Sequence, residues 1–223
     1  MGSINTNVQY GSYASGVVNG GWQSLGNTYQ NTNLIVIYLM ALLNNGNAIT
    51  KETGGSGLIR QVLITDQMRE LAHKKAKEMG TLRNSISNGD GNVIGFLGEL
   101  AAWSIIGGKL ANTYDYDIVL KDSRTVDVKS KRAKVVPLPY YECSVAAYNI
   151  KQKCDFYCFV RVTNEYDRAW VLGMVEKDRF YKMANYVAKG SIDGNNCFEI
   201  KDNCYNLKIQ ELDDAEYIVK CTF

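Results

Sequence analysis

Alternating apolar and polar side chains in residues 114–131, YDYDIVLKDSRTVDVKSK, predict a β-hairpin whose two faces differ in chemistry. The apolar side chains share one face and point towards a core: Ile118, Leu120, Val126 and Val128. A three-residue loop, 121–123, would place Asp117 directly opposite Asp127, with their Cβ atoms about 5 Å apart. A two-residue loop would send the two aspartates to opposite faces, so the apolar pattern favours the odd-length loop.

The polar face of this hairpin carries Asp117, Asp127 and Lys129, and two adjacent carboxylates raise each other's pKa unless a cation lies between them. Glu99 adds a third acid, from the segment GFLGELAAWSIIGG, which predicts a largely buried helix closed by glycines. A buried carboxylate is strongly destabilising unless it is paired or binds a cation. Carboxylate donors without histidine or thiolate select Mg²⁺ or Mn²⁺ over zinc. Lys129 can then hold an attacking water or offset negative charge in a transition state.

The order of these acids along the chain is more informative than any one of them. Asp-x-Lys alone is common and is typical of a solvated surface hairpin, whereas a helix acid, a strand acid and Asp-x-Lys in this order favour a metal-dependent phosphodiesterase site. The arrangement resembles the PD-(D/E)XK nuclease superfamily over roughly residues 92–190. The matching motifs are GFLGE with Glu99, YDIVL with Asp117, and VDVKSK with Asp127 and Lys129. Tyr116 stands where the family motif has its proline, and strand alternation favours Asp117 over Asp115 as the strand acid.

The resemblance implies a restriction-endonuclease-like α/β fold, in which a four-stranded mixed β-sheet is flanked by helices, and hydrolysis of DNA that leaves 5′-phosphate ends. Asp117 and Asp127, with Glu99 directly or through water, would bind Mg²⁺, for which Mn²⁺ can substitute. Lys129 would orient or activate the nucleophilic water. The compact size and the Asn- and Tyr-rich composition are similar to phage-encoded members, which implies the host cytoplasm as the location. Endonuclease and exonuclease action both stay open.

Basic side chains near these motifs are candidates for contacts with DNA phosphates, because a formal net charge of only +2 means that a nucleic-acid partner needs a local basic face. The candidates are Lys131, Arg132, Lys134, Lys153, Arg69 and Lys77. The first three come after the Asp-x-Lys motif, and Lys153 lies beside Gln152, a second candidate for a polar residue near the site. Arg69 and Lys77 share one face of the helix predicted from TDQMRELAHKKAKEMG. Simple solvation is the alternative interpretation of each residue.

Residues 1–50 contain no Lys, Arg, Asp or Glu, which divides the chain into an uncharged arm, 1–55, and a predicted nuclease domain, 56–223. The arm is interpreted either as an oligomerisation arm or as a weakly specified tail with one apolar segment, LIVIYLMALL. That segment is too short for a membrane span and lacks the basic flank of a signal peptide, so we expect no membrane association. The six cysteines form no CxxC pair, which favours reduced, buried thiols and a cytoplasmic protein.

Two other functions stay open beside a repair, resolving or degradative nuclease. The first is a virion- or assembly-associated binding protein that retains a nuclease fold and works through the arm. The second is a sequence-specific restriction-type enzyme, which would be a symmetric dimer. The rest of the chain has the pattern of a mixed α/β domain. Strands are predicted for DIVL, TVDVKS, YYECSVAA, DFYCFVRV and AWVLGMV, a helix for EKDRFYKMANYVAKG, and short strands and loops for the C-terminal tail.

Overall fold

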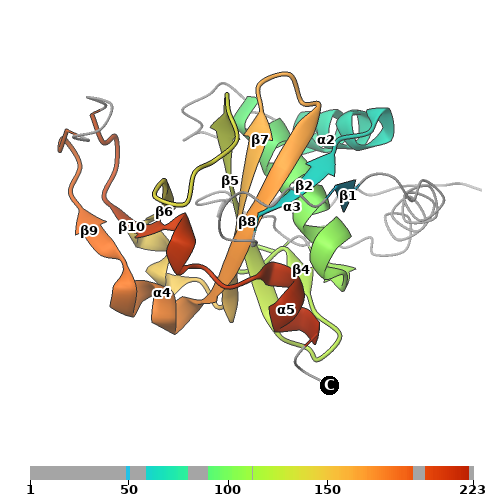
Figure 1. The fold of residues 1–223 in the computed structure, drawn as a ribbon. Helices are drawn as coiled ribbons and strands as arrows, with labels where there is room; N and C mark the ends of the chain where they lie inside the picture. Colours follow the sequence, from blue (N-terminus) through green and yellow to red (C-terminus); the bar gives the residue numbers. More distant parts are fainter. Residues whose placement is uncertain (1–48, 51–58, 80–89, 112, 193–198, 221–223) are drawn as a thin grey trace, which may run out of the picture.

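The computed structural model describes residues 49–50, 59–79, 90–111, 113–192 and 199–220, which form a mixed α/β fold around a curled sheet (Figure 1). The predicted uncharged arm lies outside the described residues, except for Ile49 and Thr50. Within the described ranges, no helix combines the length and the apolar character that crossing a membrane requires.

Ten strands form two sheets in this part of the chain. They are β1 (Ile49–Thr50), β2 (Arg60–Leu63), β3 (Lys109–Leu110), β4 (Ile118–Val119), β5 (Thr125–Ala133), β6 (Glu142–Ala146), β7 (Phe156–Thr163), β8 (Arg168–Glu176), β9 (Asn185–Val187) and β10 (Cys204–Lys208). The main sheet has the order β1–β2–β8–β7–β5–β4–β3, and the smaller one the order β6–β10–β9. In the main sheet β5 and β7 pair in parallel and the other neighbours are antiparallel, so the sheet is mixed, as expected. It contains more strands than the four that the family resemblance implies.

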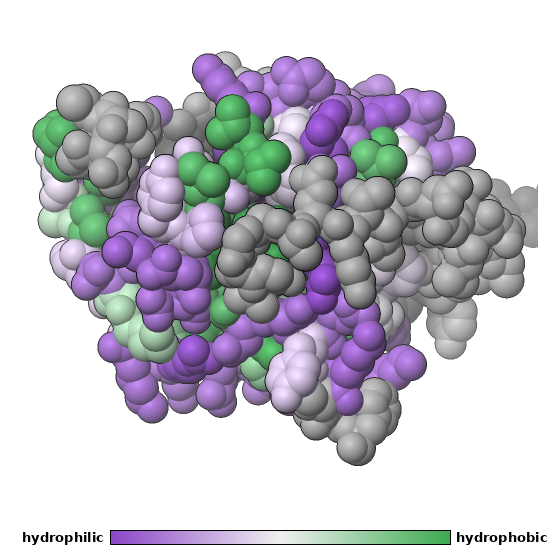
Figure 2. All heavy atoms as spheres, in the orientation of Figure 1, coloured by the Kyte–Doolittle hydropathy of each residue, from purple (hydrophilic) through white to green (hydrophobic). Residues whose placement is uncertain are grey.

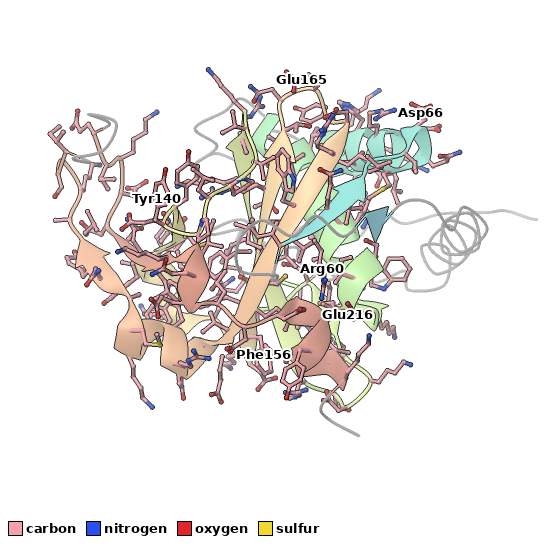
Figure 3. All side chains as sticks on the ribbon, in the orientation of Figure 1. Arg60, Asp66, Tyr140, Phe156, Glu165 and Glu216 are labelled. Atoms are coloured by element: carbon pink, nitrogen blue, oxygen red, sulfur yellow. The ribbon has the colours of Figure 1, made fainter. Side chains whose placement is uncertain are left out.

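Helices cover both faces of the main sheet. On one face lie α2 (Asp66–Met79), α3 (Asp90–Ile106) and α5 (Ala215–Lys220), where α3 contacts β5, β7 and β8 and shares one large apolar core with them. On the other face lie α4 (Lys177–Met183) and the small sheet, around a second, aromatic-rich core (Figure 1). Arg60 of β2 forms ion pairs with Asp214 at 2.6 Å and Glu216 at 3.3 Å, which tie the sheet to α5 (Figure 3).

The register of the β4–β5 hairpin agrees with the predicted three-residue loop. Ile118 pairs with Val126, and the N–H of Leu120 donates to the carbonyl of Arg124 at 2.8 Å. The turn is closed by Ser123, whose N–H donates back to the carbonyl of Leu120 and whose φ is 73°. The ladder contains only Ile118 and Val119 of β4, and the N–H of Asp117 donates to the carbonyl of Val126 at 2.9 Å, so the predicted pairing of Asp117 with Asp127 is not part of it.

The two helices predicted before the hairpin are confirmed. Thr65 begins α2, since its Oγ1 accepts the N–H of Met68 at 3.3 Å in the manner of an N-cap. Gly107 and Gly108 end α3 with φ of 69° and 89°, a left-handed conformation that glycine adopts without strain.

Two predictions in the C-terminal part are wrong. The helix expected over residues 176–190 ends at Met183, because the backbone becomes extended at Ala184 and Asn185–Val187 pairs with β10 as strand β9. The tail, expected to contain only strands and loops, includes helix α5. Asp214 starts this helix: its Oδ1 accepts the N–H of Glu216 at 2.8 Å, which provides an N-cap.

Candidate active site

Three buried acids come from three different elements of the fold. Glu99 belongs to α3, Asp117 directly precedes β4, and Asp127 lies on β5, with relative exposures of 8%, 5% and 5%. The neighbours of Asp127 in β5, Val126 and Val128, belong to the core beneath α3, so Asp127 points to the opposite face of the sheet. Glu99 on α3 and Asp127 on β5 therefore lie on opposite sides of the sheet, and the charges of both act on Asp117, which directly precedes β4.

The carboxylate of Asp117 ends that ladder. Its Oδ2 accepts the main-chain N–H of Val128 at 2.7 Å, while its own N–H donates to the carbonyl of Val126 at 2.9 Å. The side chain thus satisfies a main-chain donor of β5 that strand pairing no longer reaches. Asp115, the alternative strand acid, instead accepts the main-chain N–H of Lys153 at 3.0 Å.

Asp127 and Lys129 form an ion pair that Gln152 holds in place. Lys129 Nζ lies 2.6 Å from Asp127 Oδ2 and donates to Gln152 Oε1 at 3.1 Å. Gln152 Nε2 in turn donates to Asp127 Oδ1 at 3.2 Å and to the carbonyl of Tyr114 at 3.1 Å. The ammonium group also lies over the ring of Tyr157, 5.7 Å from its centre. Gln152 therefore belongs to the site, whereas the side chain of its neighbour Lys153 is exposed.

The charges at this site change the ionisation of Glu99 and Asp117. Burial raises the pKa of Glu99 to about 7; Lys75 acts against this and Asp127 adds to it. Burial also raises the pKa of Asp117 well above its usual value, and the charges of Glu99 and Asp127 raise it further, against the Val128 hydrogen bond and Lys129. Burial and neighbouring acids thus both disfavour the charged forms of Glu99 and Asp117.

Two lysines supply the opposing charge. Burial lowers the pKa of Lys129, but Asp127 outweighs it, so the pKa of this lysine is raised and its ammonium stays charged. Burial lowers the pKa of Lys75, which the charges of Glu99 and Asp117 partly restore. Lys75 is a functional candidate that the sequence analysis did not single out. Its signal is its spacing: it continues the buried stripe of Met68 and Ala72 on α2, a position where a lysine needs a partner.

The acids have the donor atoms that a hard divalent cation prefers, but their arrangement in the structure is not that of a formed metal site. All the donors are carboxylate oxygens, and Asp127 Oδ2 is buried, with an ion pair but no hydrogen bond of ordinary geometry. Among the described residues, no group of three or more His, Cys, Asp and Glu side chains is arranged so that it could hold a metal ion. The ammonium of Lys129 lies 2.6 Å from Asp127 Oδ2, so a cation bound by that oxygen would have to displace it.

The predicted DNA contacts separate into two groups. Lys131, Arg132 and Lys134 continue from Lys129 along β5 and the segment after it, beside the site. Arg69 and Lys77 lie on α2, in the helical layer. Arg69 donates to the carbonyls of Ile64 and Tyr166, both at 2.9 Å, and pairs with Asp66, so its guanidinium already has protein partners.

Comparison with known proteins gives no match to this chain, either among models of protein families or among curated proteins. A functional interpretation therefore depends on the side chains at this site. They include three buried acids, two lysines that act on them, and Gln152, which bridges Asp127 and Lys129.

Proposed function

We propose that this protein is a metal-dependent DNA nuclease of the PD-(D/E)XK type with a restriction-endonuclease-like fold. The proposal is supported by three buried acids, Glu99, Asp117 and Asp127, whose charges act on the pKa values of Glu99 and Asp117, and by the ion pair of Asp127 with Lys129. Buried charges weaken a fold when apolar residues could fill the same space, so three buried acids that influence one another favour a functional role.

Charge balance supports a cation as the missing partner. Three acids face two lysines, Lys75 and Lys129, so full ionisation would leave excess negative charge in a buried region. Without a cation, Glu99 and Asp117 keep their protons to a higher pH than ordinary acids, because their pKa values are raised. Asp117 and Asp127, with Glu99, would hold Mg²⁺ or Mn²⁺. When bound, such an ion polarises the scissile phosphate and acidifies a coordinated water.

The side chains around these acids suit phosphodiester hydrolysis. Lys129 can donate to a phosphate oxygen or to the attacking water, since its raised pKa keeps it protonated. Gln152 fixes the direction of Lys129 and Asp127 through one hydrogen bond to each. Glu99, with a pKa of about 7, can accept or release a proton near neutral pH. We expect DNA as the substrate, 5′-phosphate ends as the product and the cytoplasm of a host cell as the location.

The test is cleavage of plasmid, linear and single-stranded DNA with Mg²⁺ or with EDTA. We expect the wild-type protein to cleave at least one of these only with the metal present. Asp127→Asn and Lys129→Met should each lower the rate on the order of 100-fold or more while the proteins stay folded, because each loses a group that acts on the transition state. Matched controls are Asp178→Asn and Lys121→Met, exposed residues on α4 and in the hairpin loop. Normal cleavage by Asp127→Asn would remove the proposal.

One observation favours a second candidate, a binding protein that retains the fold without activity. In the described part of the chain Lys129 forms an ion pair with Asp127, and no group of acids is arranged so that it could hold a metal ion. This candidate predicts that purified wild-type protein binds DNA or its own copies but cleaves no substrate with either Mg²⁺ or Mn²⁺.

A further inference from the structure

A hollow of about 260 Å³ lies beside the end of β5, next to the candidate active site. Four cationic residues line it, Lys131, Arg132, Lys134 and Arg161, together with Tyr141 and Pro137. Among the described residues, none of those lining it is acidic. A concave surface with this lining attracts anions.

Two of these cationic residues, Lys131 and Arg161, are neighbours on adjacent strands of the main sheet. Lys131 on β5 and Arg161 on β7 are direct partners in the parallel pairing, so their side chains leave the same face together. Like charges at paired positions destabilise a sheet. Within the described ranges neither residue forms a salt bridge with an acid.

Within the chain segments that the structure describes, neither side chain has a carboxylate as its hydrogen-bond partner, and the Glu142 charge acts on Lys131 only from a distance. Arg161 is only 9% exposed, and its Nη2 donates to the main-chain carbonyl of Glu142 at 2.6 Å. Lys131 Nζ donates to Ser144 Oγ at 3.2 Å. The carboxylate of Glu142 accepts a hydrogen bond from Asn206 at 2.8 Å. Burial of its ammonium group and then the charge of Arg161 lower the pKa of Lys131, which is the direction expected for a cation held beside another cation.

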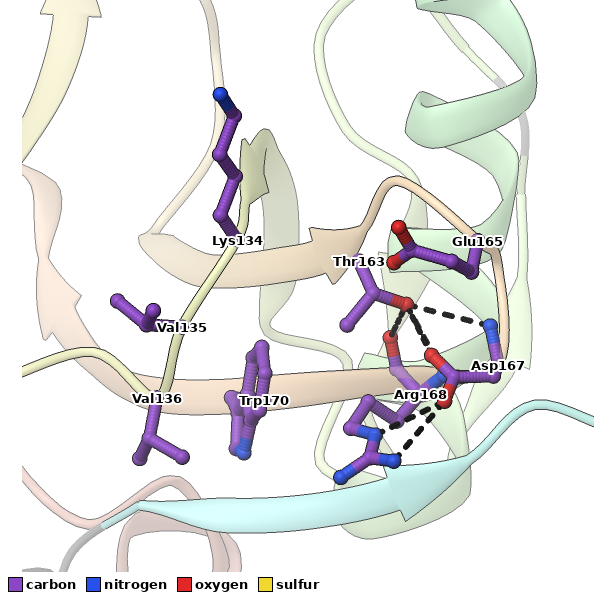
Figure 4. A pocket seen from close by; sticks show the side chains of 8 residues that line it. All are labelled: Lys134, Val135, Val136, Thr163, Glu165, Asp167, Arg168 and Trp170. Carbon is purple, nitrogen blue, oxygen red and sulfur yellow. Dashed lines mark hydrogen bonds and ion pairs between the residues drawn. The ribbon is translucent and has the colours of Figure 1, made fainter.

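A second hollow, of about 290 Å³, adjoins the first and differs from it in charge (Figure 4). Lys134 and Val135 line both hollows and separate them. The second contains Asp167, which pairs with Arg168 at 3.0 Å and accepts a hydrogen bond from Thr163 (Figure 4). Its lining includes two acids, Glu165 and Asp167, so the first hollow is the better place for an anion.

The position of the first hollow connects it to the proposed chemistry. Asp127, Lys129 and Lys131 alternate along one face of β5, and side chains two residues apart on a strand are separated by roughly 6.6 Å. We propose that the hollow binds a backbone phosphate of a nucleic acid strand next to the phosphate that is cleaved, with Arg161 as a binding residue. This inference rests on the proposed nuclease function.

The rim of the hollow suits the sugars and bases of the same strand. The segment after β5 exposes apolar side chains, Val135, Val136, Leu138 and Tyr140. Figure 2 shows a hydrophobic area over this segment. It also contains both prolines of the chain, Pro137 and Pro139, which restrict its backbone. Tyr140, which is 61% exposed, is an aromatic side chain on which a base could stack beside these cations, as in grooves that bind single strands.

The experiment measures binding without metal, so that cleavage cannot contribute. Fluorescence anisotropy in EDTA records the affinity of a short labelled single strand and a short duplex across about 50–200 mM salt. We expect Lys131→Ala and Lys134→Ala each to weaken binding several-fold and to lower the salt slope by about 0.7–0.9. Lys121→Ala, which removes an exposed lysine from the hairpin loop, is the matched control and should bind like the wild-type protein. Arg161→Gln should weaken binding and Arg161→Lys should restore part of it, with thermal melts to check folding.

Three outcomes decide the inference independently of the nuclease proposal. Wild-type affinity and salt slope in both Lys131→Ala and Lys134→Ala would overturn it, even if Asp127→Asn abolishes cleavage. An effect of these variants on binding of thymidine monophosphate but not of the oligonucleotides would also overturn it, since the hollow would then take a free nucleotide. Weakened oligonucleotide binding in a protein that cleaves nothing would support the phosphate site while the nuclease proposal fails.

Discussion

At the level of single residues, the clearest consequence of the structure concerns the ionisation of Glu99. Its pKa in the folded protein is about 7, against 4.5 for an ordinary glutamate. Between these values the unfolded chain loses its proton while the folded protein keeps it, so the free energy of unfolding falls as pH rises. The stabilisation is fully present below about pH 4.5 and is lost as pH rises through about 7, which amounts to roughly 3 kcal/mol.

Glu99→Gln should remove this pH dependence, because the amide cannot titrate. In EDTA we expect the variant to match the wild-type protein near pH 4.5 and to exceed its stability above pH 7, as measured by urea unfolding at a series of pH values. Glu70→Gln, an exposed change on α2, is the control and should follow the wild-type curve. Parallel curves for Glu99→Gln and wild type across this range would contradict the assignment.

Single residues also show where sequence reasoning succeeds and where it stops. Asp117, Asp127 and Lys129 could be placed on one face because strand alternation is a local rule. The spacing of Lys75 on the stripe of Met68 and Ala72 indicates that it is buried but not which acids it faces, and Arg161 within FVRV looks like a surface residue until the elements packed against it are known. The contacts of both residues are decided by elements distant in the sequence.

Among the elements, the β4–β5 hairpin was the most predictable, since loop length and apolar pattern must agree for both strands to bury one face. The strand β9 and the helix α5 were not predictable in the same way. The sequence pattern of Asn185–Val187 predicts a helix, but these residues pair with β10, about twenty residues later in the chain, and a local pattern does not report such a contact. Helix α5 is short and depends on the cap from Asp214 and on packing against α3 and β8.

The contact between α3 and β5 positions Glu99 and gives a test at the level of the element. A Cβ at Gly98 would lie 1.8 Å from Ser130 Oγ and 2.8 Å from Ser130 Cβ, so Gly98→Ala forces the helix and strand apart. We expect it to destabilise the protein by about 1–3 kcal/mol in urea unfolding. Gly98→Ala should be less destabilising in a Ser130→Gly background, where the clashing side chain is absent.

The same helix offers a matched control for that change. Gly95 has no atom within 4 Å of the position its Cβ would take, so Gly95→Ala should stabilise the protein by about 0.5–1 kcal/mol through helix propensity alone. If Gly98→Ala is as stabilising as Gly95→Ala, the close packing of α3 on β5 is wrong, and with it the placement of Glu99 beside the hairpin.

For the molecule as a whole, the buried charged residues that the proposed site needs lower the stability of the fold. Glu99, Asp117 and Lys75 lie where the helical layer meets the sheet, a region that would be more stable with apolar side chains. A bound divalent ion would reverse this effect, because it stabilises the ionised carboxylates that burial disfavours. Metal binding should therefore appear as stability of the entire fold.

Mg²⁺ should raise the melting temperature of the wild-type protein at a pH above 7, because this exceeds the pKa of Glu99 and its carboxylate can bind a cation. An ion that binds only the folded state at about 100 times its Kd adds about 2.7 kcal/mol, which corresponds to a rise of roughly 5–10 °C for a chain of this length. EDTA should abolish the rise, and Asp127→Asn should lose most of it because the variant lacks one carboxylate oxygen charge at the site. Asp178→Asn, exposed on α4, should keep the full rise. An equal rise in Asp127→Asn and wild type, measured by scanning calorimetry, would show that the ion acts elsewhere and would leave the buried acids without their proposed ligand.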